Sequence, residues 1–159
     1  MAISLRLVGR GYEKIMSAQS GEEGIAKVSE KNPAVALVDI DLPDMDGYQV
    51  CRNIKAQCEN DIKVILMARN INHVDIRRVK SAQADDIALK TKDCLLIMDS
   101  FQRVMSNSPK GNFHRLKERL QTGNQNPSSK SSNRLSKNNS VKVVSAKGKG
   151  NGDGNGSHL

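Results

Sequence analysis

Short apolar runs alternate with helical patterns over the first two-thirds of the chain, and this pattern ends near Met105. The apolar runs predict β-strands at residues 14–18, 34–38, 63–67 and 87–89. Apolar residues at helical spacing predict helices in between, such as the one that follows the capping-box sequence Ser-Gly-Glu-Glu at residues 20–23 and ends before Pro33. We expect a last helix to be capped by Asp93. Strands that alternate with helices at this spacing predict βαβ units and a parallel sheet, an α/β fold.

The remaining residues, 106–159, have a different composition. Ser, Asn, Gly and Lys dominate from Gln121 onward, so this part cannot bury enough apolar area to fold, and we expect a disordered tail. The sequence thus divides into a domain of residues 1–105 and a tail of residues 106–159. Phe113, Leu116 and Leu120 could form one face of a short helix, which would be marginal in isolation.

The charge of the chain lies in the tail. The formal net charge is +8, and residues 1–105 carry equal numbers of basic and acidic side chains. Such a tail could bind nucleic acid or acidic membranes through its charge. The positive charges are widely spaced and Phe113 is the only aromatic residue among them, so we expect a solvated linker without sequence-specific nucleic-acid contacts.

Several classes of protein are excluded by composition. Three cysteines are too few, and odd in number, for a disulfide-stapled scaffold. No apolar run approaches the roughly 20 residues of a membrane span, and the first residues lack the apolar stretch of a secretory signal. Histidines and cysteines at the spacing of a zinc site are absent from the sequence. We therefore expect a soluble protein of the reducing cytoplasm.

The most informative segment is Leu-Val-Asp-Ile-Asp-Leu-Pro-Asp-Met-Asp-Gly, residues 37–47. It places Asp39 at the carboxyl end of a buried parallel strand, where open α/β sheets build their sites. A carboxylate there can act as a nucleophile toward a phosphoryl group if cations neutralise the incoming charge. The alternative is an acidic loop whose aspartates only cap turns.

This segment strongly resembles the phosphoacceptor loop of the receiver domain of two-component response regulators. Gly-Arg-Gly-Tyr at residues 9–12 and the capping box match the end of that family's first helix and the start of its second. Ala-Asp-Asp at residues 84–86 precedes Lys90 by the family's spacing. The resemblance covers residues 1–105 and implies a flavodoxin-like, doubly wound parallel sheet.

The resemblance also implies roles for individual residues. Asp39 would accept a phosphoryl group from a sensor histidine kinase or a phosphotransfer protein, and Lys90 would contact that group. Asp39 and the backbone carbonyl of Asp41 would bind Mg²⁺. The protein would be a signalling component and not an enzyme.

The sequence departs from the family at several positions. Aligning Tyr12 places Met1 inside the first helix, so the family's first strand and its metal-binding acidic pair are missing. Ala68 stands where the family has a hydroxyl residue, Ile87 where it has an aromatic residue, and Thr91 where it has a proline. We therefore expect weak Mg²⁺ binding and phosphorylation that is slow or absent, and a Met1 start that could reflect a truncated reading frame.

The missing strand would lie in the middle of the family's sheet. Either residues 14–18 pair directly with residues 34–38, or unpaired edges remain that could bind another chain. We expect a destabilised sheet of four strands. One functional alternative is a pseudo-receiver, which binds proteins without being phosphorylated. Another is a phosphatase of the haloacid-dehalogenase type, with Asp39 and Asp41 as its Asp-x-Asp motif and residues 84–86 as a poor second acidic motif.

Overall fold

The computed structural model describes residues 2–57, 61–106 and 141–144 of the 159-residue chain. The strands are β1 (Ile15–Ala18), β2 (Val35–Asp39), β3 (Lys63–Ala68), β4 (Asp86–Leu89) and β5 (Val141–Val144). The helices are α1 (Ala2–Gly9), α2 (Gly21–Lys31), α3 (Gly47–Gln57), α4 (Ile76–Ser81) and α5 (Leu95–Met105), with a short 3-10 helix, η1 (Ile71–His73).

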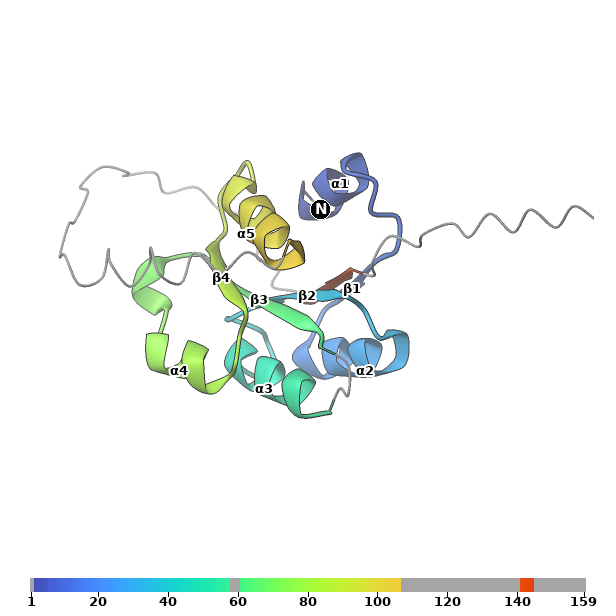
Figure 1. Ribbon diagram of the computed structural model, residues 1–159. Helices are drawn as coiled ribbons and strands as arrows, with labels where there is room; N and C mark the ends of the chain where they lie inside the picture. The colour runs from blue at the N-terminus through green and yellow to red at the C-terminus, as the bar shows by residue number, and fades with distance from the viewer. Residues whose placement is uncertain (1, 58–60, 107–140, 145–159) are drawn as a thin grey trace, which may run out of the picture.

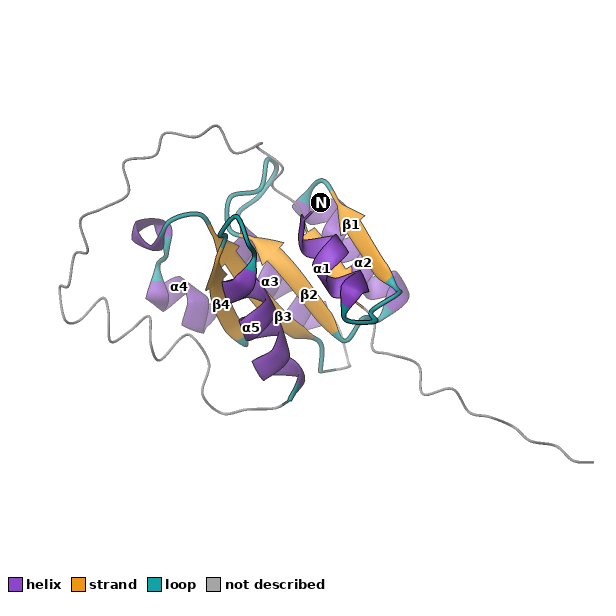
Figure 2. Cartoon of the chain, turned by 90° about the horizontal axis from the view of Figure 1, so that it is seen from above, coloured by secondary structure: helices purple, strands orange, loops and turns teal. Residues whose placement is uncertain are grey.

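The strands form one sheet in the order β1-β5-β2-β3-β4. β2, β3 and β4 are parallel, whereas β5 runs antiparallel to both of its neighbours. Helices α1 and α5 cover one face of the sheet, and α2, α3 and α4 cover the other (Figure 1). Seen from above, α1 lies toward β1 and α5 toward β3 and β4 (Figure 2). The predicted α/β fold with a mainly parallel, doubly wound sheet is confirmed.

The structure explains why residues 35–38 of β2 are all apolar. All five residues of this strand are buried, because helices cover both faces of the sheet. Val35 and Leu37 pack with α1 and α5, while Ala36 and Val38 pack with the helices on the other face. Asp39 is the last residue of this strand and is fully buried. Its carboxylate therefore lies inside the protein, at the edge of the sheet where the parallel strands end.

The centre of the sheet differs from both expected outcomes. β1 does not pair with β2, and the position between them is not open. It is filled by β5, which comes from the segment predicted to be disordered (drawn in red-brown in Figure 1). The prediction of a tail without structure is therefore wrong for residues 141–144; the remainder of the tail, including the possible helix around Phe113, lies outside the described residues. The sheet has five strands because a vacant position with two unpaired edges favours any segment that can pair.

The helix ends follow local sequence signals, with one exception. Ser20 accepts a hydrogen bond from the Glu23 amide at 3.2 Å, and α2 ends at Asn32 in the left-handed conformation (φ 49°), as the capping box and the following proline predict. At α5, Cys94 occupies the N-cap position and gives no side-chain cap. Asp93 lies one residue further out and accepts from the Leu95 amide at 3.3 Å, so the predicted cap is displaced by one residue.

Within the described ranges, no helix is long and apolar enough to cross a membrane.

Candidate functional site

Asp39 and Lys90 meet at the carboxyl edge of the sheet. Asp39 is the last residue of β2, and Lys90 directly follows β4, two strands away. The Lys90 amide donates to the Ala68 carbonyl at 2.7 Å, which fixes the lysine backbone beside the end of β3. From there its ammonium group forms an ion pair with Oδ2 of Asp39, whose side chain is completely buried. The structure thus brings together the two residues that the sequence pattern selects.

The loop after Asp39 folds back on the strand end. Gly47, the first residue of α3, donates its amide to the Ile40 carbonyl at 3.0 Å. A Cβ atom at Gly47 would lie 2.2 Å from the carbonyl oxygen of Asp39, so only glycine fits this approach. The loop from Asp39 to Gly47 is therefore closed tightly, and it holds the Asp39 backbone in place.

Two further aspartates of this loop act on helix starts. Asp44 accepts hydrogen bonds from the Gly21 and Glu22 amides of α2 at 2.8 and 3.0 Å. Its slight burial opposes ionisation, but these amides outweigh it and lower the pKa of the Asp44 carboxyl. The alternative in which the aspartates of this loop cap turns is therefore correct for Asp44 at the start of α2. It is also correct for Asp46 at the start of α3.

Asp46 has two partners at the start of α3. Its Oδ1 accepts from the Gln49 amide at 2.9 Å, and its Oδ2 pairs with Arg78 of α4 at 2.5 Å. Arg78 also lies over the Tyr48 ring, 4.4 Å from its centre. Partial burial opposes ionisation of Asp46, but the Gln49 amide and Arg78 outweigh it and lower the pKa of this carboxyl. Through these two contacts, the carboxylate joins the loop to α3 and α4.

The surroundings of Asp39 offer few further polar groups. Ala68, at the end of β3, is fully buried and supplies no hydroxyl. Ile87 is fully buried in β4. Thr91 donates its hydroxyl to Asp93 at 2.6 Å, on the exposed loop before α5. At these three positions the chain therefore lacks the family's hydroxyl, aromatic and proline residues. Among the described residues, Lys90 is the cation that contacts Asp39.

The described residues around Asp39 do not fit a complete magnesium site. Both carboxylate oxygens of Asp39 already accept hydrogen bonds, Oδ1 from the Asp41 amide at 3.2 Å and Oδ2 from Lys90. Among the residues that the structure describes, no group of three or more His, Cys, Asp and Glu side chains could hold a metal ion. The predicted carbonyl ligand belongs to Asp41, an exposed residue. A divalent cation would have to compete with Lys90 for the same carboxylate.

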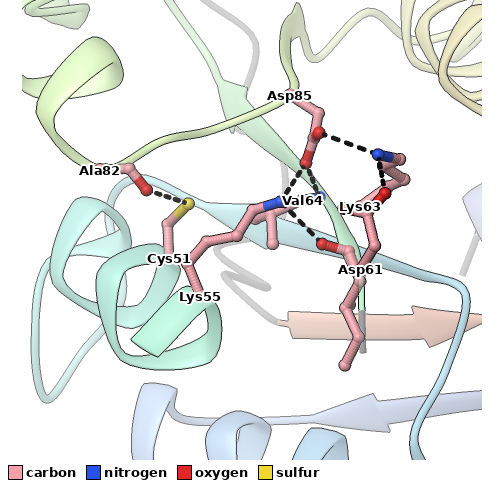
Figure 3. Close-up of polar contacts among 8 residues, drawn as sticks. Cys51, Lys55, Asp61, Lys63, Val64, Ala82 and Asp85 are labelled. Atoms are coloured by element: carbon pink, nitrogen blue, oxygen red, sulfur yellow. Dashed lines mark hydrogen bonds and ion pairs between the residues drawn. The ribbon is translucent and has the colours of Figure 1, made fainter. Parts of the chain in front are cut away.

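The other acidic motif lies at the opposite edge of the sheet. Asp85 accepts from Lys55 and from the Val64 amide, each at 2.7 Å, and it lies 3.7 Å from Lys63 (Figure 3). Asp86 begins β4 and is buried against α5. Because β2 and β4 run in the same direction, both residues lie a full strand length from Asp39. This separation rules out the phosphatase interpretation, which needs the second acidic motif beside the nucleophile.

Sequence reasoning missed Lys142 and Ser17. Lys142 lies in the interior strand β5, paired with Leu37 of β2 and Ser17 of β1. Its ammonium group donates to the Ser17 hydroxyl at 3.0 Å. The available signal for this strand was the run Val-Lys-Val-Val at residues 141–144, which is rich in β-branched residues within an otherwise polar tail.

Comparison with known proteins agrees with this geometry. The family model described as the response regulator receiver domain matches residues 1–101. The transcriptional regulatory protein AfsQ1 of Streptomyces coelicolor is 34% identical over 89 residues, which cover 56% of this chain and 38% of that protein. The response regulator protein VraR of Staphylococcus aureus is 32% identical over 92 residues, covering 58% of this chain and 44% of VraR. The chain therefore spans less than half the length of these relatives.

Solved structures show the same likeness. The signal receiver domain of a signal transduction histidine kinase from Syntrophus aciditrophicus has a TM-score of 0.56 and 29% identity, covering 68% of this chain and 82% of that one. The signal receiver domain of a modulated diguanylate cyclase from Desulfovibrio desulfuricans shares the fold, with a TM-score of 0.53, 24% identity, and coverage of 74% and 87%. With its mainly parallel sheet, its Asp39–Lys90 pair and a family match over residues 1–101, the chain belongs to the receiver domains of response regulators, which act in two-component signalling.

Proposed function

We propose that this receiver domain accepts a phosphoryl group on Asp39, delivered by a sensor histidine kinase or a phosphotransfer protein. The observation that carries the proposal is the contact between Lys90 and the buried Asp39 carboxylate at the carboxyl edge of the sheet. Receiver domains of response regulators are generally not enzymes, and this chain takes the role of the acceptor. We place this exchange in the cytoplasm, because phosphate-donating partners of this kind meet their receivers there.

The reaction needs a nucleophile and a cation, and the two residues supply them. An oxygen of Asp39 forms a bond to phosphorus while the bond from phosphorus to the donor nitrogen, or to the oxygen of a small phosphodonor, breaks. The electron pair of that bond leaves with the donor: a histidine nitrogen takes up a proton from solvent, whereas the carboxylate of an acyl phosphate leaves as the anion. Lys90 then moves its ammonium group from the carboxylate to a phosphoryl oxygen, where it offsets the added negative charge.

The reaction should be slow. Receiver domains typically bind Mg²⁺, whereas the described residues around Asp39 provide one carboxylate whose two oxygens already accept hydrogen bonds. Ala68 provides no hydroxyl for a phosphoryl oxygen. Lys90 is the described cation that contacts Asp39 and offsets the charge of the transferred group, and Mg²⁺ would have to displace it from Asp39 in order to bind there. These features also favour the second candidate, a pseudo-receiver that binds protein partners without accepting phosphate.

Phosphodonor labelling of the full chain separates the two candidates. Incubation with acetyl phosphate and Mg²⁺, followed by intact-mass measurement, should give a slow gain of about 80 mass units, one phosphoryl group. The gain should vanish in Asp39→Asn and persist in the matched variant Asp41→Asn, which changes an exposed carboxylate two residues away. An adduct that survives in Asp39→Asn would refute Asp39 as the acceptor, and no adduct at all would refute phosphorylation and favour the pseudo-receiver.

A further inference from the structure

The strand β5 is packed as an integral part of the sheet. Val141 is fully buried on the face covered by α2. A Cβ atom at Gly24 of α2 would lie 2.8 Å from the Val141 side chain, so the absence of a side chain at Gly24 makes room for this valine. β5 pairs with β1 and β2 along its whole length. Its position therefore depends on close contacts on both edges and on one face.

The next residue brings a positive charge into the sheet. Successive side chains of a strand point to opposite faces, so Lys142 lies on the face covered by α1 and α5. Only 9% of its surface is exposed, and its ammonium group donates to the Ser17 hydroxyl at 3.0 Å. No carboxylate of the described residues forms an ion pair with it. Burial, and then repulsion from Lys90, lower the pKa of Lys142.

Lys142 shares this face with Asp39. Leu37, opposite Lys142, and Asp39 point the same way from β2, since they are two residues apart. Asp39 is therefore the diagonal neighbour of Lys142 on the adjacent strand, a relation that separates the two residues by about 7–8 Å. Lys90, in contact with Asp39, is close enough to repel Lys142. This part of the sheet holds two lysines and one carboxylate.

We propose that Lys142 couples the docking of β5 to the charge at Asp39, so that a phosphoryl group on Asp39 holds the tail strand more firmly in the sheet. The phosphorylated state rests on the proposed function. The phosphoryl group replaces one negative charge by about two, and it draws Lys90 toward itself. The buried Lys142 then faces a more negative neighbourhood, which reduces the cost of its charge. Loss of negative charge at Asp39 has the opposite effect.

The coupling is large enough to measure. A unit charge about 8 Å away changes an equilibrium roughly thirtyfold at an effective dielectric constant of about 20, which is typical of a site near the protein surface. Salt screening and the shift of Lys90 with the phosphoryl group reduce this effect, and we expect about fivefold. Linkage makes the effect reciprocal: docked β5 strengthens the retention of negative charge at Asp39 by the same factor. The docking of β5 thereby depends on whether Asp39 carries a phosphoryl group.

Amide hydrogen exchange of the full chain tests this coupling. With acetyl phosphate and an observed mass gain, exchange at residues 141–144 should slow about fivefold, while exchange in β3 (Lys63–Ala68), as an internal reference, changes less. In Lys142→Met the slowing should be absent. The control variant Lys14→Met removes the same charge from an exposed position and should respond like the natural chain. Equal slowing in Lys142→Met, or no slowing in the phosphorylated natural chain, would overturn the proposal.

A second set of variants tests the coupling without phosphorylation. Lys90→Met removes the repelling charge and should slow exchange at residues 141–144, whereas Asp39→Asn removes the attracting charge and should speed it. Both effects should disappear when Lys142→Met is added. Effects that persist in the double variants would overturn the proposal. If no phosphoryl adduct forms, the proposed function fails, and these variants still decide whether the coupling exists.

Discussion

A buried carboxylate, Asp86, joins β4 to α5. It is 1% exposed and accepts hydrogen bonds from the Ser100 hydroxyl and from Arg103, the latter at 3.1 Å. Arg103 pairs with a second carboxylate, Asp99, which is half exposed. The two contacts differ in their surroundings, because one is enclosed by β4 and α5 and the other faces solvent. They should therefore contribute differently to stability.

The variant Asp86→Ala should lower the free energy of unfolding by about 3 kcal/mol, since it leaves Arg103 partly buried without its interior partner. The Nε atom of Arg103 already lacks a hydrogen-bond partner among the described residues, so the loss of Asp86 would leave a second part of this guanidinium group unpaired in the interior. Asp99→Ala, which removes the solvent-facing partner of the same arginine, should cost less than about 1 kcal/mol. Urea denaturation of both variants measures the difference. Equal losses would contradict the distinction between the two carboxylates.

At the scale of elements, the acidic loop after β2 supports helix α2. Asp44 accepts hydrogen bonds from the Gly21 and Glu22 amides, which lie at the helix start and have no acceptor inside the helix. Ser20 satisfies the next donor, the Glu23 amide. The loop that begins at Asp39 thus holds a neighbouring helix as well as the acceptor carboxylate.

The variant Asp44→Ala should destabilise the protein by about 1 kcal/mol at neutral pH, the usual value of a lost helix cap. Because the folded state lowers the pKa of Asp44 below its ordinary value of 3.8, the stabilisation is complete above that pH and is lost as the pH falls through the lowered value. The difference in unfolding free energy between the natural chain and the variant should therefore shrink below about pH 3.8. Asp41→Ala, an exposed neighbour, serves as the control; a pH-independent difference would refute the role of the Asp44 charge.

Elements with two covered faces were predictable from their sequences. β2 and β3 read as strands because both of their faces are buried, and α2 carries its own start and stop signals. The pairing of Asp39 with Lys90 was implied by the resemblance to receiver domains, and the structure agrees, since Asp39 ends β2 and Lys90 directly follows β4 at the same edge of the sheet. Lys142 was missed, because the run Val-Lys-Val-Val is a weak strand signal in a polar tail and forms a strand only where the sheet has a vacant position. That vacancy is a property of the assembled fold and is not visible in the sequence around residues 141–144.

At the scale of the molecule, the sheet depends on a strand that comes from far along the chain. Without β5, β1 has no described neighbour, and α2 loses its contact with Val141. β2 would expose one edge of unpaired amides and carbonyls in the middle of the protein. β5 therefore joins β1 to β2 within the sheet, in addition to the packing of α2 on α3 and the hydrogen bonds of Asp44 to α2.

Two shortened chains test this dependence. A chain ending at Ser140 lacks β5, and one ending at Val144 retains it, so their difference isolates four residues. We expect the shorter chain to unfold at lower temperature and less cooperatively, with a loss of about 3 kcal/mol or more, because one fully buried valine and the backbone pairing on two edges disappear. Its open edges should also promote self-association, which sedimentation measures. Identical thermal melting of the two chains by circular dichroism would mean that the sheet closes without β5, by direct pairing of β1 with β2.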